Sequence, residues 1–213
     1  MITLKVDPNN PDMQAIRVAA DAIRRGELVI FPTETVYGLA ADAFNEAAVK
    51  AVYDAKGRLD HQPLPVQVGS VQDVFRAAEF MSPEARRLAE MYWPGPLTLV
   101  LNKSASLPSI VTSGGDTVGV RVPDHPVALG LVKELGSPIV ATSANVSGRP
   151  APRTAVEAIR DVGENVSVVL DGGDSRFGIA STVVDMTVSP PKIVRRGSVE
   201  VADIRKVLGE VEE

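Results

Sequence analysis

The chain has 213 residues, of which 45% are hydrophobic and 23% charged, so it can fill one globular core and is unlike a disordered chain. It contains no cysteine, which excludes disulfides, zinc–thiolate sites and iron–sulfur clusters. Its two histidines, His61 and His125, are too few for a multi-histidine metal site. A net charge of −5 does not suit a dedicated nucleic-acid binder, which usually carries a strong basic excess.

Helical and strand patterns alternate along the chain. A helix opens at Asn10-Pro11 and ends at Gly26, a β-prone run follows at 27–31, and Asn45 caps a helix over 46–56. The remaining strands are expected at 63–69, 97–101, 118–122, 138–142, 166–170, 181–185 and 192–195, and the remaining helices after Ser70, after Ser82-Pro83, and at 126–135, 154–161 and 201–208.

This alternation indicates an α/β fold built on one large mixed sheet, because helices separate only some of the strands. The proline-rich turns are too short to be linkers, so we expect a single domain over 1–213 with a core from about 7 to 200. The N-terminus lacks the basic and apolar regions of a signal peptide, and no apolar run approaches the roughly 20 residues of a membrane helix. We therefore expect a cytoplasmic protein with no membrane contact.

The sequence carries no P-loop, dinucleotide-binding glycine motif, nucleophile elbow or zinc-protease motif. Candidate chemistry lies instead in four polar segments, of which the first is FPTETVYGL at 31–39, where an apolar strand meets two threonines and a glutamate. In isolation, an N-cap that opens a short helix explains this segment as well as a functional site does.

The second segment is AKGRLDHQPLPV at 55–66, a polar segment where Lys56 and Arg58 flank a glycine at a predicted helix end. Cations at that position favour the helix dipole, but a Lys–Arg pair also suits a triphosphate.

The third segment is PIVATSANVSGRP at 138–150, where Ser143 and Asn145 follow a strand in a turn. Small polar side chains there can cradle phosphate or sugar oxygens, although turn chemistry alone accounts for each of them.

In the fourth segment, DTVGVRVP at 116–123, strand alternation places Thr117, Gly119 and Arg121 on one face. An arginine inside an apolar strand either extends to the surface or meets an anion, and two polar residues on one face favour a cleft.

Seven blocks in order resemble the YrdC-like family: PTETVYGL, AKGR with PLPVQV, WPGPLTLVL, VGVRVPDHPVA, TSANVSGRP, STVVD and IVRRG. The resemblance runs from about Asp7 to Glu200. It implies a twisted, open α/β sheet flanked by helices, with a large concave cleft. Longer members carry a second C-terminal domain, which we do not expect in this chain.

The resemblance also implies a function and a set of site residues. The family's single-domain members are L-threonylcarbamoyladenylate synthases, which join L-threonine, bicarbonate or CO2 and ATP, with Mg2+, and release pyrophosphate. The ATP-side positions implied are Lys56, Arg58, Gln62, Thr117, Ser143, Asn145, Ala151 and Arg195, with Lys56 and Arg58 as catalytic cations. The L-threonine positions implied are Thr35, Gln67, Arg121, Ala141 and Ser181.

Several positions depart from the family pattern, which puts details of affinity in doubt. Gln67 stands where long-form members often have histidine, and Ala180 replaces a glutamate before Ser181. The other departures are Arg196 for proline, Gln62 for asparagine and Ala151 for serine. No metal-binding residues are expected, because the ATP phosphates would hold Mg2+.

The partners implied are proteins that transfer the threonylcarbamoyl group to tRNA, with weak contact to tRNA itself. An RNA-binding or ribosome-maturation module is the main alternative, which the acidic balance and the 4% aromatic content disfavour. A carbamoyl-handling domain of hydrogenase maturation proteins requires cysteine-rich fingers that this chain lacks. A catalytically silent relative is a third alternative, against which the Lys–Arg–Ser–Asn set argues.

Overall fold

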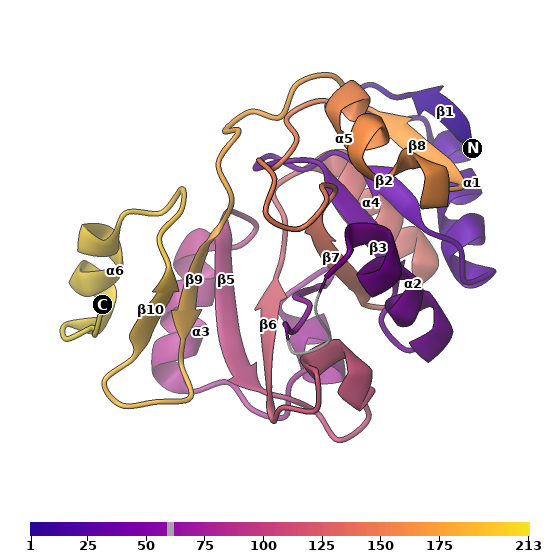
Figure 1. Cartoon of the computed structure of the whole chain (residues 1–213). Helices are drawn as coiled ribbons and strands as arrows, with labels where there is room; N and C mark the ends of the chain where they lie inside the picture. The colour runs from indigo at the N-terminus through magenta and orange to yellow at the C-terminus, as the bar shows by residue number, and fades with distance from the viewer. Residues whose placement is uncertain (59–61) are drawn as a thin grey trace.

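A mixed sheet runs through the chain in the order β1-β8-β2-β3-β7-β4-β6-β5-β9-β10 (Figure 1). The computed structural model describes residues 1–58 and 62–213, so His61 lies outside the described residues. The strands are β1 Ile2–Lys5, β2 Val29–Phe31, β3 Gly38–Asp42, β4 Val66–Gln67, β5 Leu97–Asn102, β6 Thr117–Arg121, β7 Ile139–Ser143, β8 Val168–Asp171, β9 Thr182–Asp185 and β10 Lys192–Arg195. The sheet contains parallel pairs, such as β4 with β6, and antiparallel pairs, such as β5 with β6, which confirms the predicted mixed α/β sheet.

Six α-helices flank the sheet in the described part of the chain. They are α1 Met13–Arg24, α2 Glu46–Lys56, α3 Pro83–Tyr92, α4 Pro126–Leu135, α5 Ala155–Val162 and α6 Val201–Leu208. The predicted caps hold at two of them, because Asn45 accepts from Ala48 N and Ser82 accepts from Ala85 N. Gly57 ends α2 in the left-handed conformation, with a φ of 55°, which a glycine adopts without steric cost.

Four local predictions were wrong or incomplete. Helix α1 begins after Asp12, whose carboxylate accepts from Gln14 N, rather than at Asn10-Pro11. The segment after Ser70 forms a short 3-10 helix, Gln72–Arg76, instead of an amphipathic α-helix. Strands β1 and β3 were not predicted, since β1 is mostly exposed and the small residues of β3 lack a strand signature.

Helices α1 and α4 cover one face of the β1-β8-β2-β3-β7 half of the sheet (Figure 1). Val29 and Phe31 point into this layer, while Ile30 between them points to the opposite layer beneath α2 and α5. Both faces of this half are therefore buried, which explains the unbroken apolar run of β2.

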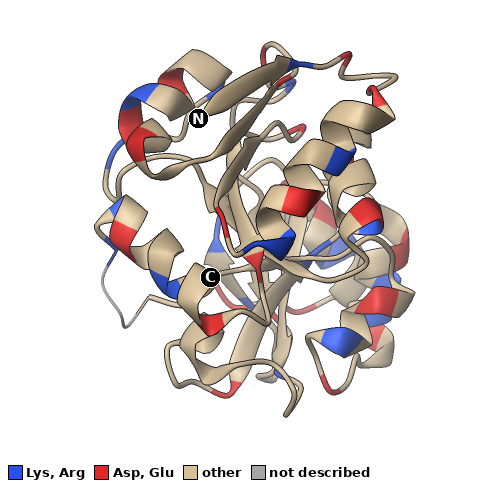
Figure 2. Ribbon diagram, turned by 90° about the vertical axis from the view of Figure 1, so that its right-hand side faces the viewer, with Lys and Arg blue, Asp and Glu red and all other residues tan. Residues whose placement is uncertain are grey.

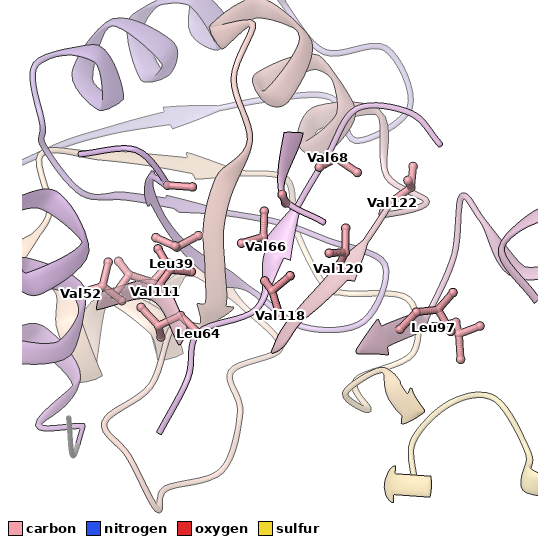
Figure 3. Close-up of a cluster of buried hydrophobic side chains, with 14 of the residues drawn as sticks. Leu39, Val52, Leu64, Val66, Val68, Leu97, Val111, Val118, Val120 and Val122 are labelled. Carbon is pink, nitrogen blue, oxygen red and sulfur yellow. The ribbon is translucent and has the colours of Figure 1, made fainter. Parts of the chain in front are cut away.

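The other half of the sheet is covered on one face only. Leu97, Leu99 and Leu101 of β5 pack toward α3 and the main core, and in Figure 3 the side chains of Val118 and Val120 of β6 gather with Val66 of β4. Because strand side chains alternate, the residues between them point away from this core. The opposite face, which α1 and α4 do not reach, holds the cleft described below.

Two glycine-to-alanine changes are expected to affect stability in opposite directions. A Cβ at Gly38 would lie 2.6 Å from Cε1 of the Phe31 ring, so Gly38→Ala is expected to destabilise the fold by about 1–3 kcal/mol. A Cβ at Gly130 in α4 would lie 3.7 Å from Ile16, an ordinary contact, so Gly130→Ala is expected to stabilise it by about 0.5–1 kcal/mol. Urea unfolding of both variants measures these values, and a shift of the two midpoints in the same direction would contradict the packing described here.

Candidate functional site

A cavity of about 470 Å³ lies on the open face of β4, β6, β5 and β9, beside the end of β7. Thr117 and Arg121 form its floor from β6, on the face that the sequence predicted. The predicted site residues that line it are Thr35, Arg58, Gln67, Thr117, Arg121, Ala141, Ser143, Ser181 and Arg195. Residues that are far apart in the sequence, such as Thr35 and Arg195, therefore line the same cavity.

Four predicted site residues do not contribute to the described lining of this cavity: Lys56, Gln62, Asn145 and Ala151. Gln62 lies beside it, since its backbone oxygen accepts a 3.0 Å hydrogen bond from Arg58 Nε. Asn145 is buried in the turn after β7, where its amide donates to the backbone oxygens of Val146 and Arg149. Ala151 is half-buried between that turn and α5.

Lys56 lies behind the cleft wall with only 1% of its surface exposed, although the sequence puts it on a polar segment. Its ammonium donates to the backbone oxygens of Ser143 and Asn145, the latter at 2.7 Å, and lies 3.4 Å from Asn145 Oδ1. Burial, followed by the positive charge of Arg58, lowers the pKa of Lys56 to about 7, and Asp161 opposes this shift. In this structure Lys56 fastens the end of α2 to the turn that presents Ser143.

Arg58 and Arg195 face the cavity without a carboxylate partner among the described residues. Arg58 donates to the backbone oxygens of Gln62 and Pro63, and Arg195 donates from Nε and Nη2 to the backbone oxygen of Ser181. Burial lowers the pKa of both guanidinium groups, and for Arg195 the positive charges of Arg121 and Arg58 add to that shift. Arg195 thus lies close enough to Arg121 and to Arg58 to be repelled by both charges.

Arg121 is 6% exposed and meets an anion that the sequence analysis did not assign. Its Nη2 lies 2.7 Å from Glu34 Oε1, Nη1 donates to Thr35 Oγ1 at 3.0 Å, and Nε donates to the backbone oxygen of Gly95 at 3.0 Å. The two hydrogen bonds use two of the five N–H donors of the guanidinium, so three form no hydrogen bond among the described residues. The surface-arginine alternative is therefore wrong.

Polar groups near Arg121 complete this end of the cavity. Gln67 pairs with Arg121 across β4 and β6, is 5% exposed, and has no hydrogen-bond partner for Oε1 among the described residues. Ser181 Oγ lies 2.8 Å from Thr98 Oγ1 and accepts from Arg195 Nη2 at 3.1 Å. This end of the lining therefore combines a guanidinium, an amide and a hydroxyl group.

Sequence reasoning missed Glu34, Thr33 and Thr98 as parts of the site. Thr33 bonds to Thr35 and to the backbone oxygen of Val36, so it shapes the turn from β2 into β3. The same turn forms no helix, which rules out the N-cap explanation of this segment. A glutamate between two threonines directly after a buried strand was the available signal for Glu34.

Comparison with known proteins places the chain in a family. Residues 21–197 match the Sua5/YciO/YrdC family model, described as "Telomere recombination". The chain belongs to this family, which confirms the resemblance drawn from the seven sequence blocks.

Named relatives share much of the sequence. The chain is 46% identical over 196 residues to a threonylcarbamoyl-AMP synthase of Pyrococcus abyssi, covering 92% of this chain and 58% of that protein. It is 39% identical to the Bacillus subtilis enzyme of the same name, covering 99% of this chain and 60% of that one. The chain thus spans about three-fifths of the length of these relatives.

A solved structure has the same fold. The structure of P. abyssi Sua5 complexed with L-threonine matches with a TM-score of 0.97 and 44% identity, covering 100% of this chain and 62% of that one. This match confirms the YrdC-like fold class. Among the helices that the structure describes, none is long and apolar enough to cross a membrane.

The positive charge at the cleft is a local feature and does not extend over the whole surface. Figure 2 shows acidic and basic residues interspersed over the helices, in keeping with the net charge of −5. Around the cavity, by contrast, Arg58, Arg121 and Arg195 converge. Such a cluster of guanidinium groups on a low-dielectric wall suits a polyanion.

Lys56→Met is expected to change how stability depends on pH. Between about pH 7 and its ordinary pKa of 10.5, Lys56 is neutral in the folded chain and charged in the unfolded chain, so its contribution to stability rises with pH. The difference in unfolding free energy between wild type and Lys56→Met is therefore expected to grow in favour of wild type from pH 7 to pH 10. Lys5→Met, which removes an exposed lysine, is the matched control and is expected to show no such slope.

Chemical denaturation at a series of pH values makes this measurement. A flat difference for Lys56→Met across the range would show that the buried ammonium keeps its proton. The unfavourable burial inferred here would then be wrong.

Proposed function

We propose that this chain makes threonylcarbamoyl-AMP and pyrophosphate from L-threonine, bicarbonate or CO2, and ATP. The observation that carries the proposal is the cavity itself, whose two ends differ in charge. Arg58 and Arg195 are cations without a carboxylate partner in the described chain, whereas Arg121 is paired with Glu34. The end with Arg58 and Arg195 suits a triphosphate, and the end with Arg121 suits an amino acid. The names of the relatives, which mention threonylcarbamoyl-AMP and L-threonine, support these two assignments.

The reaction brings anions together, so the protein's main task is electrostatic. The amino group of threonine adds to CO2 to form a carbamate, and a carbamate oxygen attacks the α-phosphorus of ATP. The bond from the α-phosphorus to the bridging oxygen breaks, and pyrophosphate leaves with the bond electrons. Arg58 and Arg195 are placed to neutralise the charge that develops on the phosphates.

The remaining ATP contacts are assigned to Thr117 and Ser143, which face the cavity. Lys56 and Asn145 support the turn of Ser143 from behind. Gln62 and Ala151 are further ATP-side positions in this proposal. The threonine end comprises Thr35, Gln67, Arg121, Ala141 and Ser181.

Mg2+ enters in this proposal as part of the Mg·ATP substrate. Within the described residues there is no group of three or more histidine, cysteine, aspartate or glutamate side chains that could hold a metal ion. The donor set of the cleft therefore fits metal held by phosphate oxygens rather than a resident metal site.

The product is a mixed anhydride that water would hydrolyse, so a partner must accept it quickly. We assign that role to proteins that transfer the threonylcarbamoyl group to tRNA, with weak contact to tRNA itself. Arg58, Arg121 and Arg195 are concentrated around one cavity, which favours a small-molecule substrate over the alternative of an RNA-binding module.

The direct test is release of pyrophosphate by the purified protein with ATP, threonine and bicarbonate. Release is expected only when all three are present, and Arg58→Ala is expected to reduce turnover by about 10²-fold, the scale of losing one preorganised electrostatic contact. Arg58 donates to loop carbonyls, so the melting temperature is expected to change little. Arg87→Ala, which removes an exposed arginine of α3, is the control. Release without threonine, or unchanged turnover in Arg58→Ala, would refute the assignment.

Arg121→Lys is expected to weaken threonine binding while ATP binding stays nearly unchanged. A guanidinium grips a carboxylate with two parallel hydrogen bonds, which an ammonium cannot reproduce. The expected cost is about 1.5–3 kcal/mol, or roughly ten- to a hundredfold in affinity. Calorimetric titration of threonine and of ATP measures both effects, and a loss confined to ATP would place Arg121 on the phosphate side.

A further inference from the structure

Glu34 is a buried carboxylate beside the cleft that none of the assigned roles uses. It lies in the turn between β2 and β3 and is 1% exposed. Its Oε1 is 2.7 Å from Arg121 Nη2, and neither oxygen has a well-aligned hydrogen-bond partner among the described residues. A buried carboxylate without compensation is very costly, so the ion pair with Arg121 is what permits its burial.

Glu34 acts from behind the wall rather than from within the cavity. Its neighbours Thr33 and Thr35 line the cavity, whereas Glu34 is absent from the described lining. Its backbone oxygen accepts from Phe177 N at 2.8 Å, which joins this turn to the segment between β8 and β9. Glu34 is therefore a positioning residue whose effect on a ligand passes through Arg121.

The pair makes the two ends of the cavity electrostatically different. Arg58 and Arg195 donate to backbone oxygens, which carry no net charge. Arg121 faces a full negative charge at contact distance. The Arg58 and Arg195 end therefore keeps a net positive charge, while the Arg121 end is nearly neutral but retains free N–H donors.

We propose that Glu34 cancels the charge of Arg121 and fixes its orientation, so that this end of the cleft admits a zwitterionic amino acid and rejects a second phosphate anion. The proposal deepens the proposed function and rests on it for the identity of the amino acid. A zwitterion has no net charge and loses little when the pocket is neutral. A phosphate anion, in contrast, needs uncompensated cations to replace its hydration.

The test is Glu34→Gln, which keeps the shape and removes the charge. Titration with inorganic pyrophosphate is expected to show binding about tenfold tighter than in wild type, with pyrophosphate now competing against L-threonine. Threonine affinity is expected to fall about tenfold, and the KM for threonine to rise more than kcat falls. Glu79→Gln removes the same charge from an exposed position and is the matched control, expected to leave both affinities unchanged.

A second variant separates charge from orientation. Glu34→Asp keeps the charge on a shorter side chain, so pyrophosphate affinity is expected to stay at the wild-type value while threonine affinity falls. Unchanged pyrophosphate and threonine affinities in Glu34→Gln would overturn the proposal. Equal tightening of pyrophosphate in Glu34→Asp and Glu34→Gln would also overturn it, because charge would then not be the cause.

If Glu34→Gln fails to fold, the double variant Glu34→Gln/Arg121→Gln decides, since it leaves no unpaired buried charge. Its pyrophosphate affinity is expected to equal that of wild type, and tighter binding would refute the charge argument. These titrations do not require turnover. Failure of wild type to release pyrophosphate would refute the proposed function alone, whereas normal release with unaltered binding in Glu34→Gln would refute the role of Glu34 alone.

Discussion

The repulsion of Arg195 by the positive charges of Arg121 and Arg58 is the constraint around which the cleft is organised. Arg121 is buried and Arg58 is partly buried, and the pKa of Arg195 is lowered by burial and by the charges of the other two. The fold tolerates this arrangement by turning backbone oxygens toward two of them and a carboxylate toward the third. An anionic ligand removes part of the remaining repulsion, so the cleft is organised for binding.

The place of the cleft follows from a sheet that is covered unequally. Helices α1 and α4 pack over one face from β1 to β7 and extend no further. Beyond β7, alternation along β5 and β6 sends every second residue to the core and turns the others toward the cleft. Thr98, Thr117 and Arg121 are polar because they occupy this uncovered face. Function at this site therefore depends on where a helical layer ends.

The sequence predicted those features that depend on local periodicity. Helix α4 has the predicted bounds, and the alternation in β6 correctly placed Arg121 on the polar face. Prediction failed where tertiary packing outweighs local preference. Strand β3 consists of small residues that a strand pattern does not mark, and it exists because β2 and β7 pair with it on both sides. It is this pairing that places the PTET turn over the cleft.

In the candidate site, too, local periodicity predicted some features, whereas features set by tertiary packing were missed. Strand position predicts which way Arg121 points, but no local pattern tells that Glu34 is its partner, because the two residues are distant in sequence. Lys56 has the sequence of a surface lysine at a helix end, yet it is 1% exposed because the turn after β7 folds over it. Buried charge is a property of the assembled fold and is not readable from a single segment.

These two buried charges have parallel roles at opposite ends of the cleft. Lys56 holds the backbone that presents Ser143, and Glu34 holds the guanidinium of Arg121. Each lies one layer behind a group that faces the ligand, so each fixes geometry without occupying space in the cavity. Groups held in this way need little reorganisation when a substrate arrives, which is the main electrostatic advantage of a folded site over water. The geometry of the cleft thus depends as much on Lys56 and Glu34 as on the groups that line the cavity.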